Sequence, residues 1–90
     1  MGDDDYFIYL LSDGDRFKVG ITNNLERRLS QCQTGNSRKL FYVCVGKRRN
    51  KQTALYVEKS IHRGLKQYRL AGEWFALNDD LIERVKREIL

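Results

Sequence analysis

The sequence contains no proline, and its 90 residues include only two cysteines, one tryptophan and one histidine. Because proline is absent, no domain boundary is obvious. We expect residues 1–90 to form a single domain, near the lower size limit for a core that folds without disulfide bonds or bound metals. Cys32 and Cys44 match no metal-ligand spacing and fall among apolar residues, which favours packing roles in a reducing compartment.

Long apolar runs are also missing. No stretch approaches the ~20 apolar residues of a membrane span. The opening Met1-Gly2-Asp3-Asp4-Asp5 lacks the basic and apolar segments of a secretory signal. We therefore expect a cytoplasmic protein without a membrane partner. Apolar residues still make up 41% of the chain, which is enough for a compact core.

Acidic residues are scarce in the middle of the chain. Residues 16–51 carry ten Lys or Arg against Glu26 alone, a local charge of +9, within a chain of net charge +5. Such a concentration is typical of a polyanion-binding surface, although a solvated basic surface that serves solubility would look the same. A basic loop is expected over Gly46–Asn50. In and beside it, the residues predicted to contact DNA phosphates without reading sequence are Lys47, Arg48, Arg49 and Lys51.

Apolar periodicity predicts an α+β fold, with a small, mainly antiparallel three-stranded sheet flanked by three helices. A continuous aromatic and aliphatic run predicts a strand buried on both faces, and an alternating segment predicts its antiparallel neighbour. Apolar positions three and four residues apart, preceded by Asn or Asp, indicate the helices. The predicted strands are Tyr6–Leu11, Arg16–Ile21 and Leu40–Val45; the predicted helices are Asn24–Gln33, Gln52–Tyr68 and Leu81–Ile89, the last capped by Asn78 or Asp79; Gly72–Leu77 is a short extended segment.

Two charged residues occupy positions where apolar ones are expected. Arg28 falls on the apolar stripe of the first predicted helix, whereas its neighbour Arg27 points to solvent. Glu58 lies one residue off the stripe of the second helix, with His62 one turn further on. A half-buried charge needs a partner, a metal or a ligand, since stranding it costs on the order of several kcal/mol. Arg28 and Glu58 therefore mark where chemistry is expected.

Taken in order, the unusual residues of the chain resemble the motifs of the GIY-YIG nuclease domain. These are Tyr9 at the end of Phe7-Ile8-Tyr9, the second motif Lys18-Val19-Gly20, Arg28 eight residues later, the helix segment Glu58-Lys59-Ser60-Ile61-His62, and Trp74-Phe75. The resemblance covers residues 6 to about 77 and is to a phage- and bacteria-associated branch of the family.

The resemblance implies hydrolysis of DNA phosphodiester bonds with one divalent cation, Mg²⁺ or Mn²⁺. Glu58 would hold the metal through its carboxylate. Arg28 would stabilise transition-state charge with a bidentate fork, and Tyr9 would activate or position the attacking water. Lys18 would hold the scissile phosphate or share the base role, and His62 would support Glu58.

The resemblance also implies contacts to the nucleic acid. Gly20 would leave room for the backbone and a phosphate to approach, and the solvent-facing Arg27 would join the basic loop on the DNA. A protein partner could supply specificity that the small domain lacks. We expect Tyr9, Lys18, Arg28 and Glu58 to converge on one concave, positively charged surface.

The sequence departs from the family pattern in ways that keep other functions open. Phe7 replaces a glycine of the first motif, Lys18 replaces the tyrosine of the second, and Cys32 stands where relatives carry His or Tyr. The alternative is a catalytically weakened or inactive nucleic-acid-binding module of the same fold. A third possibility is a small protein-interaction domain whose basic face meets an acidic partner.

Each candidate residue also has a purely structural interpretation. Tyr9 could be a core aromatic, and the stem of Arg28 could lie along the core with its head in solvent. Trp74 and Phe75 are expected to close the core. Retention of Arg28 together with a carboxylate favours an enzyme, because a carboxylate beside a phosphate site repels DNA unless a cation bridges the two.

Overall fold

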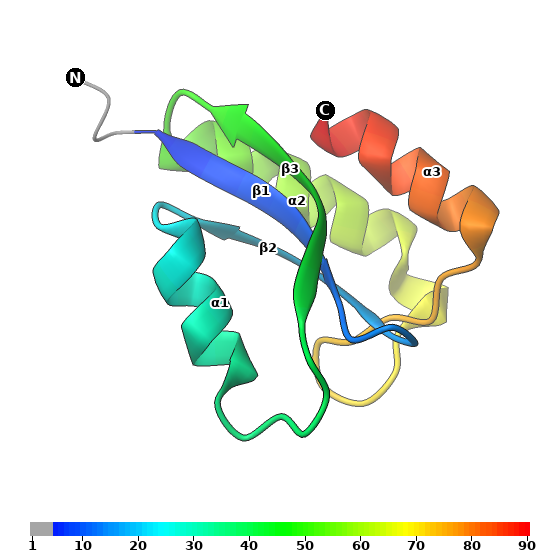
Figure 1. Ribbon diagram of the computed structural model, residues 1–90. Helices are drawn as coiled ribbons and strands as arrows, with labels where there is room; N and C mark the ends of the chain where they lie inside the picture. The colour runs from blue at the N-terminus through cyan, green and yellow to red at the C-terminus, as the bar shows by residue number, and fades with distance from the viewer. Residues whose placement is uncertain (1–4) are drawn as a thin grey trace.

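The computed structural model describes residues 5–90 and confirms the α+β class, with a three-stranded antiparallel sheet and three helices (Figure 1). No helix within these residues is long and apolar enough to cross a membrane. The elements in chain order are β1 (Tyr6–Ser12), β2 (Phe17–Thr22), α1 (Leu25–Gln33), β3 (Phe41–Arg48), α2 (Lys51–Gly64), the short 3₁₀ helix η2 (Lys66–Tyr68) and α3 (Asp79–Ile89).

The most apolar strand lies at the centre of the sheet. The strand order is β2-β1-β3, and β1 pairs antiparallel with both neighbours. Tyr9 therefore lies opposite Gly20 on β2 and opposite Val45 on β3. A central strand is covered on both faces and both edges, which explains why five consecutive residues of β1, from Ile8 to Ser12, are buried.

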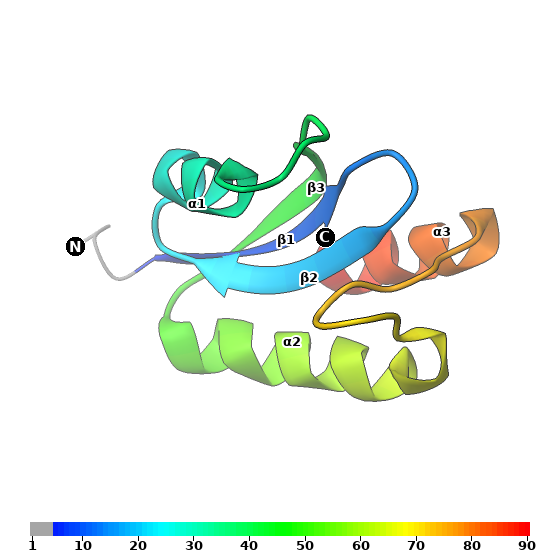
Figure 2. The same ribbon diagram turned by 90° about the horizontal axis from the view of Figure 1, so that it is seen from below.

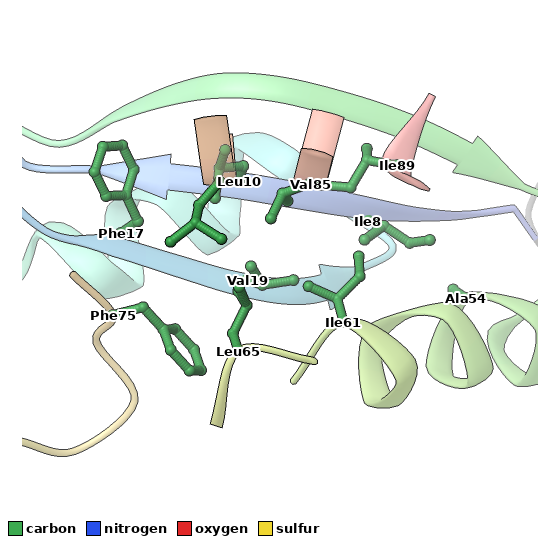
Figure 3. Packing of buried hydrophobic residues seen from close by; sticks show 11 residues of the cluster. Ile8, Leu10, Phe17, Val19, Ala54, Ile61, Leu65, Phe75, Val85 and Ile89 are labelled. Carbon is green, nitrogen blue, oxygen red and sulfur yellow. The ribbon is translucent and has the colours of Figure 1, made fainter. Parts of the chain in front are cut away.

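The helices cover the two faces of the sheet unequally. Figure 2 shows α1 on one side and α2 with α3 on the other. Because side chains alternate along a strand, Ile8 and Leu10 join the core under α2 and α3, whereas Tyr9 and Leu11 join a smaller cluster under α1. Figure 3 shows the larger cluster, in which the labelled helical residues are Ala54, Ile61, Val85 and Ile89, with Leu65 directly after α2.

An asparagine caps the start of each of the three α-helices. The side chains of Asn24, Asn50 and Asn78 accept a hydrogen bond from the backbone N–H three residues later, at 2.9, 2.8 and 2.9 Å. Each cap satisfies an N–H that has no partner inside the helix. Of the two candidates for the last cap, Asn78 is therefore the one used.

The predicted basic loop is wrong at its first three positions. Gly46, Lys47 and Arg48 continue β3 and pair with residues 8, 7 and 6 of β1. A Cβ atom at Gly46 would lie 2.9 Å from the backbone carbon of Ile89, so only glycine lets α3 pack this closely on the strand. Only Arg49 and Asn50 remain to link β3 with α2.

Two further predicted boundaries also differ. Helix α2 ends at Gly64 rather than Tyr68, and the last predicted turn becomes the 3₁₀ helix η2. The segment predicted as extended contains no strand. Instead, Phe75 alone forms isolated bridges with Phe17 and Arg69. Tertiary packing sets both boundaries, because Phe75 pairs with Phe17 at the edge of β2 and joins the core cluster that also holds Leu65.

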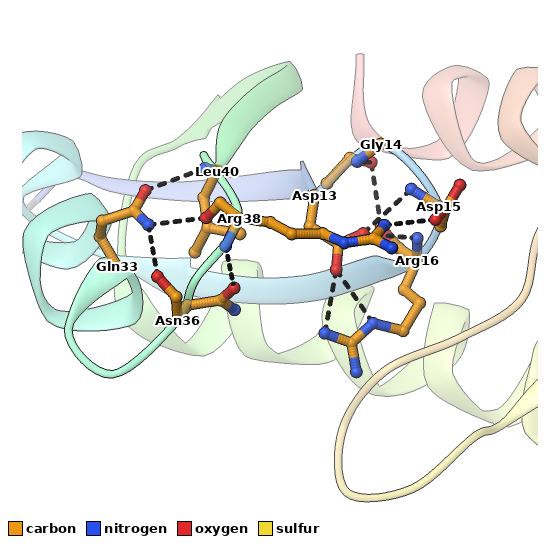
Figure 4. A network of polar contacts seen from close by, with 9 residues as sticks. Asp13, Gly14, Asp15, Arg16, Gln33, Asn36, Arg38 and Leu40 are labelled. Atoms are coloured by element: carbon orange, nitrogen blue, oxygen red, sulfur yellow. Dashed lines mark hydrogen bonds and ion pairs between the residues drawn. The ribbon is translucent and has the colours of Figure 1, made fainter.

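A polar network fixes the turn between β1 and β2 (Figure 4). The buried Asp13 carboxylate accepts hydrogen bonds from the backbone N–H groups of Asp15 and Arg16, at 3.0 and 2.8 Å, and from the Arg16 guanidinium. Burial alone would raise the pKa of Asp13, but these donors lower it to about 2. Asp15 in turn pairs with Arg38, which ties this turn to the segment that follows α1.

Candidate active site

A hydrogen bond joins the first strand to the first helix. Arg28 Nε donates to the Tyr9 hydroxyl at 3.0 Å across a separation of 19 residues. Tyr9 has no exposed surface, and Arg28 is half-buried on the side of α1 that faces the sheet. Because only Nε is used, the two terminal nitrogens of the guanidinium remain a fork that can bind a carboxylate or a phosphate.

The space around the Tyr9 ring is provided by Gly20. A Cβ atom at Gly20 would lie 2.6 Å from Tyr9 Cζ and closer still to the hydroxyl oxygen. Gly20 is itself buried. The expectation that Gly20 admits a phosphate is therefore wrong, because the Tyr9 side chain fills that space.

Tyr42 completes the support of this pair, and sequence reasoning missed it. Its ring packs edge-on against Tyr9, with centroids 5.4 Å apart, and its hydroxyl donates to the Leu25 carbonyl at 2.8 Å. This bond anchors the first residue of α1 to β3. Burial raises the pKa of Tyr42 to about 12, so the hydroxyl keeps its proton. A tyrosine within an apolar strand was the available signal, since a buried hydroxyl usually has a partner.

The Tyr9 hydroxyl is placed to orient Arg28 rather than to meet solvent. Burial raises the pKa of Tyr9, and the hydrogen bond from Arg28 only partly offsets this effect. With no exposed surface, the hydroxyl has no direct contact with bulk water. Neither expected role, activating or positioning the attacking water, is therefore open to the Tyr9 hydroxyl by direct contact, and its partner is instead Arg28.

Lys18 lies on the same face of β2 as Gly20, two residues along the strand. Its side chain is half-buried, and Nζ lies 4.9 Å from the centroid of the Trp74 ring. The guanidinium of Arg16 lies 4.4 Å from the same ring. Trp74 packs on the α1 side of the sheet and Phe75 on the other, so both are core residues, as expected. The indole holds Lys18 at the end of the site through a cation–π contact.

His62 holds α2 against the outer edge of β2. Its Nε2 lies 2.8 Å from the Val19 carbonyl, and since a carbonyl only accepts, Nε2 is the donor. The ring also packs edge-on against Phe75, with centroids 5.4 Å apart. His62 was expected to support Glu58, but the partner that the structure gives to its Nε2 is this backbone carbonyl. Glu58 lies one turn earlier on the same side of α2, so His62 sets its position through the helix.

The charges of Glu58 and Arg28 act on one another around the edge of β2, although α2 and α1 cover opposite faces of the sheet. Burial raises the pKa of Glu58, and the nearby Glu73 raises it further, whereas His62, Lys59 and Arg28 lower it. Glu58 in turn contributes to the raised pKa of Tyr9. The charges of Glu58 and Arg28 therefore influence one another, although within residues 5–90 no hydrogen bond or ion pair joins Glu58 to Arg28 or Tyr9.

Glu73 is a second carboxylate that sequence reasoning missed. It raises the pKa of both Arg28 and Glu58, and it immediately precedes the Trp74 that packs over Lys18. Its place directly before Trp74-Phe75 was the one available signal. No three His, Cys, Asp or Glu side chains within residues 5–90 form a preformed metal cage. A single carboxylate still suits Mg²⁺, which commonly keeps several waters and takes ligands from substrate phosphates.

The basic residues at the end of β3 are partly engaged within the protein. Lys47 forms an ion pair with Asp5 at 3.0 Å. Arg48 is half-buried and donates to the Glu88 carbonyl at 3.1 Å. An exposed ion pair contributes little stability, so Lys47 can exchange Asp5 for another anion at low cost.

The other basic candidates lie near the starts of the first two helices. Arg27 is exposed in the first turn of α1, where its guanidinium donates to Asn23 Oδ1 at 3.3 Å. Arg49 and Lys51 are exposed at the start of α2. This end of the sheet is also where β3 ends and β1 begins, because Arg48 pairs with Tyr6. The basic residues are therefore gathered at one end of the molecule.

Comparison with known proteins gives one family. The model of the T5orf172 domain matches residues 6–90, which is nearly the whole chain. No curated protein and no solved structure matches the chain significantly.

Proposed function

The chain belongs to the T5orf172 domain family, and from this membership and the site at the β2 edge we propose that it is a divalent-metal-dependent endonuclease of GIY-YIG type. Its reaction is hydrolysis of DNA phosphodiester bonds. The observation that carries the proposal is the hydrogen bond between Arg28 and Tyr9. It links the strand tyrosine to the helix arginine, two residues whose order in the sequence resembles the nuclease motifs.

Arg28 is the group that stabilises charge on the phosphate in the transition state. Its Nε is held by Tyr9, so the remaining two nitrogens can approach two phosphate oxygens with little loss of side-chain freedom. Lys18 binds the same phosphate or takes part in proton transfer from the nucleophilic water. The ring of Trp74 beside it limits the positions that the Lys18 ammonium can occupy.

Glu58 is the residue that would hold the metal ion, either Mg²⁺ or Mn²⁺. Burial raises the pKa of its carboxyl, and a bound cation would reverse this effect by favouring the ionised form. When bound, the ion supplies Lewis-acid stabilisation of the phosphate and lowers the pKa of a bound water. Glu58 also needs a neighbouring positive charge to offset its repulsion of DNA, and the charge of Arg28, which lowers the pKa of Glu58, supplies one.

DNA is the proposed partner, bound mainly through its backbone phosphates. The exposed cations at the starts of α1 and α2 provide the surface for this contact. Such contacts carry no sequence information, so we infer weak sequence discrimination by this domain alone.

The test is nicking of supercoiled plasmid with Mg²⁺ or Mn²⁺. Wild type should nick the plasmid, and both Arg28→Lys and Glu58→Gln should lose the activity. The matched controls are Arg63→Lys and Glu88→Gln, which change the same chemical groups at exposed positions away from the site. Nicking by either site variant at the wild-type rate would remove that residue from the mechanism.

A non-catalytic nucleic-acid-binding module is the second candidate, favoured by two observations. Lys18 stands where the motif tyrosine is expected, and the other tyrosine, Tyr9, has no solvent contact. The two functions differ in how metal affects binding. For the enzyme, Mg²⁺ at constant ionic strength should strengthen binding in wild type but not in Glu58→Gln. For the module, Glu58→Gln should bind DNA at least as well as wild type, and divalent ions should only weaken binding by screening the attraction between the protein and the DNA phosphates.

A further inference from the structure

A depression of about 310 Å³ opens beside Arg28, where the end of β2 meets the starts of α1 and α2. Polar and basic groups dominate its lining, and within residues 5–90 no carboxylate belongs to it. The residues that matter for the argument are Thr22, Asn23, Arg27, Arg28, Gln31 and Lys51. We refer to this depression as the α1–α2 groove.

The groove gathers three positive side chains that come from two separate elements. Arg27 and Arg28 are neighbours in the first turn of α1, and Lys51 is the first residue of α2. Both helices also direct the positive ends of their dipoles toward this region. Asn23 accepts from Arg27, which steadies that guanidinium at the rim. The combination selects an anion with several oxygen acceptors.

The groove is continuous with the proposed active site because Arg28 belongs to both. Its Nε bonds to Tyr9, while its side chain also forms part of the groove wall. Arg27 and Lys51 lie further along this wall, away from Tyr9. A single phosphate at Arg28 would leave Arg27 and Lys51 without an anion. An anion that meets all three cations therefore needs at least two negatively charged groups along its length.

We propose that the α1–α2 groove binds a backbone phosphate that flanks the scissile phosphate, so that the DNA strand runs from Arg28 toward the start of α2. This inference rests on the proposed function, which places the scissile phosphate against Arg28. The flanking phosphate lies between Arg27 and Lys51. The apolar side chains of Tyr6 and Ile21, which also line the groove, contact the adjoining sugar.

The first test measures binding without catalysis. A short fluorescein-labelled DNA duplex is titrated in EDTA, and affinity is read from fluorescence anisotropy at several salt concentrations. Arg27→Gln and Lys51→Gln should each weaken binding about 5- to 10-fold and reduce the salt slope by about one unit. Controls are Arg63→Gln, near the other end of α2, and Lys66→Gln, at the start of η2; they remove the same charges and should stay within about 2-fold of wild type.

The second test separates binding from chemistry. In the plasmid-nicking assay, Lys51→Gln should raise KM about 5-fold and leave kcat within about 2-fold, since it contacts a phosphate that does not react. Equal losses of affinity in groove and control variants would overturn the groove. Loss of affinity confined to Arg27→Gln and Lys51→Gln, with no nicking by wild type, would keep the groove as a phosphate site and reject the nuclease.

Discussion

The sharpest prediction concerns Gly20, the residue opposite Tyr9. In Gly20→Ala, the added methyl carbon would lie 2.6 Å from Tyr9 Cζ, whereas ordinary contacts begin at 3.4 Å. The tyrosine ring must therefore move by about 1 Å. It cannot move freely, because Tyr9 is fully buried, packs against Tyr42 and is hydrogen-bonded to Arg28.

The expected loss in the free energy of unfolding of Gly20→Ala is the sum of three contributions. Overpacking of a buried ring costs about 1–3 kcal/mol. Loss of the Arg28 hydrogen bond adds about 1 kcal/mol. Replacing glycine in a strand by alanine recovers about 0.5–1 kcal/mol of backbone entropy. The net loss should be about 2 kcal/mol, which corresponds to a fall in Tm of roughly 8–16 °C for a domain of this size.

Urea denaturation followed by circular dichroism measures this loss. Gly64→Ala is the matched control, because its methyl carbon would meet only the end of the Arg84 side chain, at 3.3 Å, and alanine favours the helix. The double variant Gly20→Ala/Tyr9→Leu should lose less stability than the two single losses added together, since the ring that clashes is gone. A Gly20→Ala protein as stable as wild type would refute the packing argument.

Three further predictions concern charged groups. Glu58→Gln should raise the free energy of unfolding at pH 7, because burial raises the pKa of Glu58 and its ionised form destabilises the fold. Below about pH 4 the carboxyl is protonated in both the folded and the unfolded protein, so this gain in stability should vanish there. Urea denaturation at a series of pH values measures it. Asp13 has a pKa lowered to about 2, so it contributes about 1–2 kcal/mol above pH 4 that is lost as the pH falls toward 2. In Asp13→Asn the free energy of unfolding should therefore fall less steeply as the pH drops from 4 to 2. The same pH dependence as in wild type would contradict this. Arg28→Lys should reduce plasmid nicking at least about 100-fold, because a lysine can neither bond to Tyr9 in the same way nor present a planar fork.

The fold was predictable where local patterns and tertiary packing agree. The alternation of Phe17, Val19 and Ile21 identified β2, and the spacing of Ala54, Val57 and Ile61 identified α2. The end of β3 could not be predicted, because it depends on pairing with a strand far away in the sequence. Lys47 and Arg48 look like loop residues, yet they lie in β3 because the first residues of β1 pair with them.

The sequence singled out Arg28 and Tyr9 as candidates, but it did not show that they contact one another. Arg28 stood out as a charge on an apolar stripe, and the structure shows its partner to be Tyr9. That Gly20 makes room for a tyrosine rather than a phosphate depends on the register between β1 and β2. Glu73 escaped notice because its position depends on how the segment after α2 returns to the sheet.

The contacts along β2 also bear on self-association. An outer strand with free backbone groups is a template on which another chain can add a strand. Phe17 exchanges backbone hydrogen bonds of 3.0 and 2.7 Å with Phe75, and the Val19 carbonyl accepts from His62. Both backbone groups of Phe17 and the carbonyl of Val19, which an incoming strand would need, are thus occupied. Replacing His62 by a residue without a donor would reopen part of the edge and should favour aggregation of the folded protein through strand addition next to Gly20.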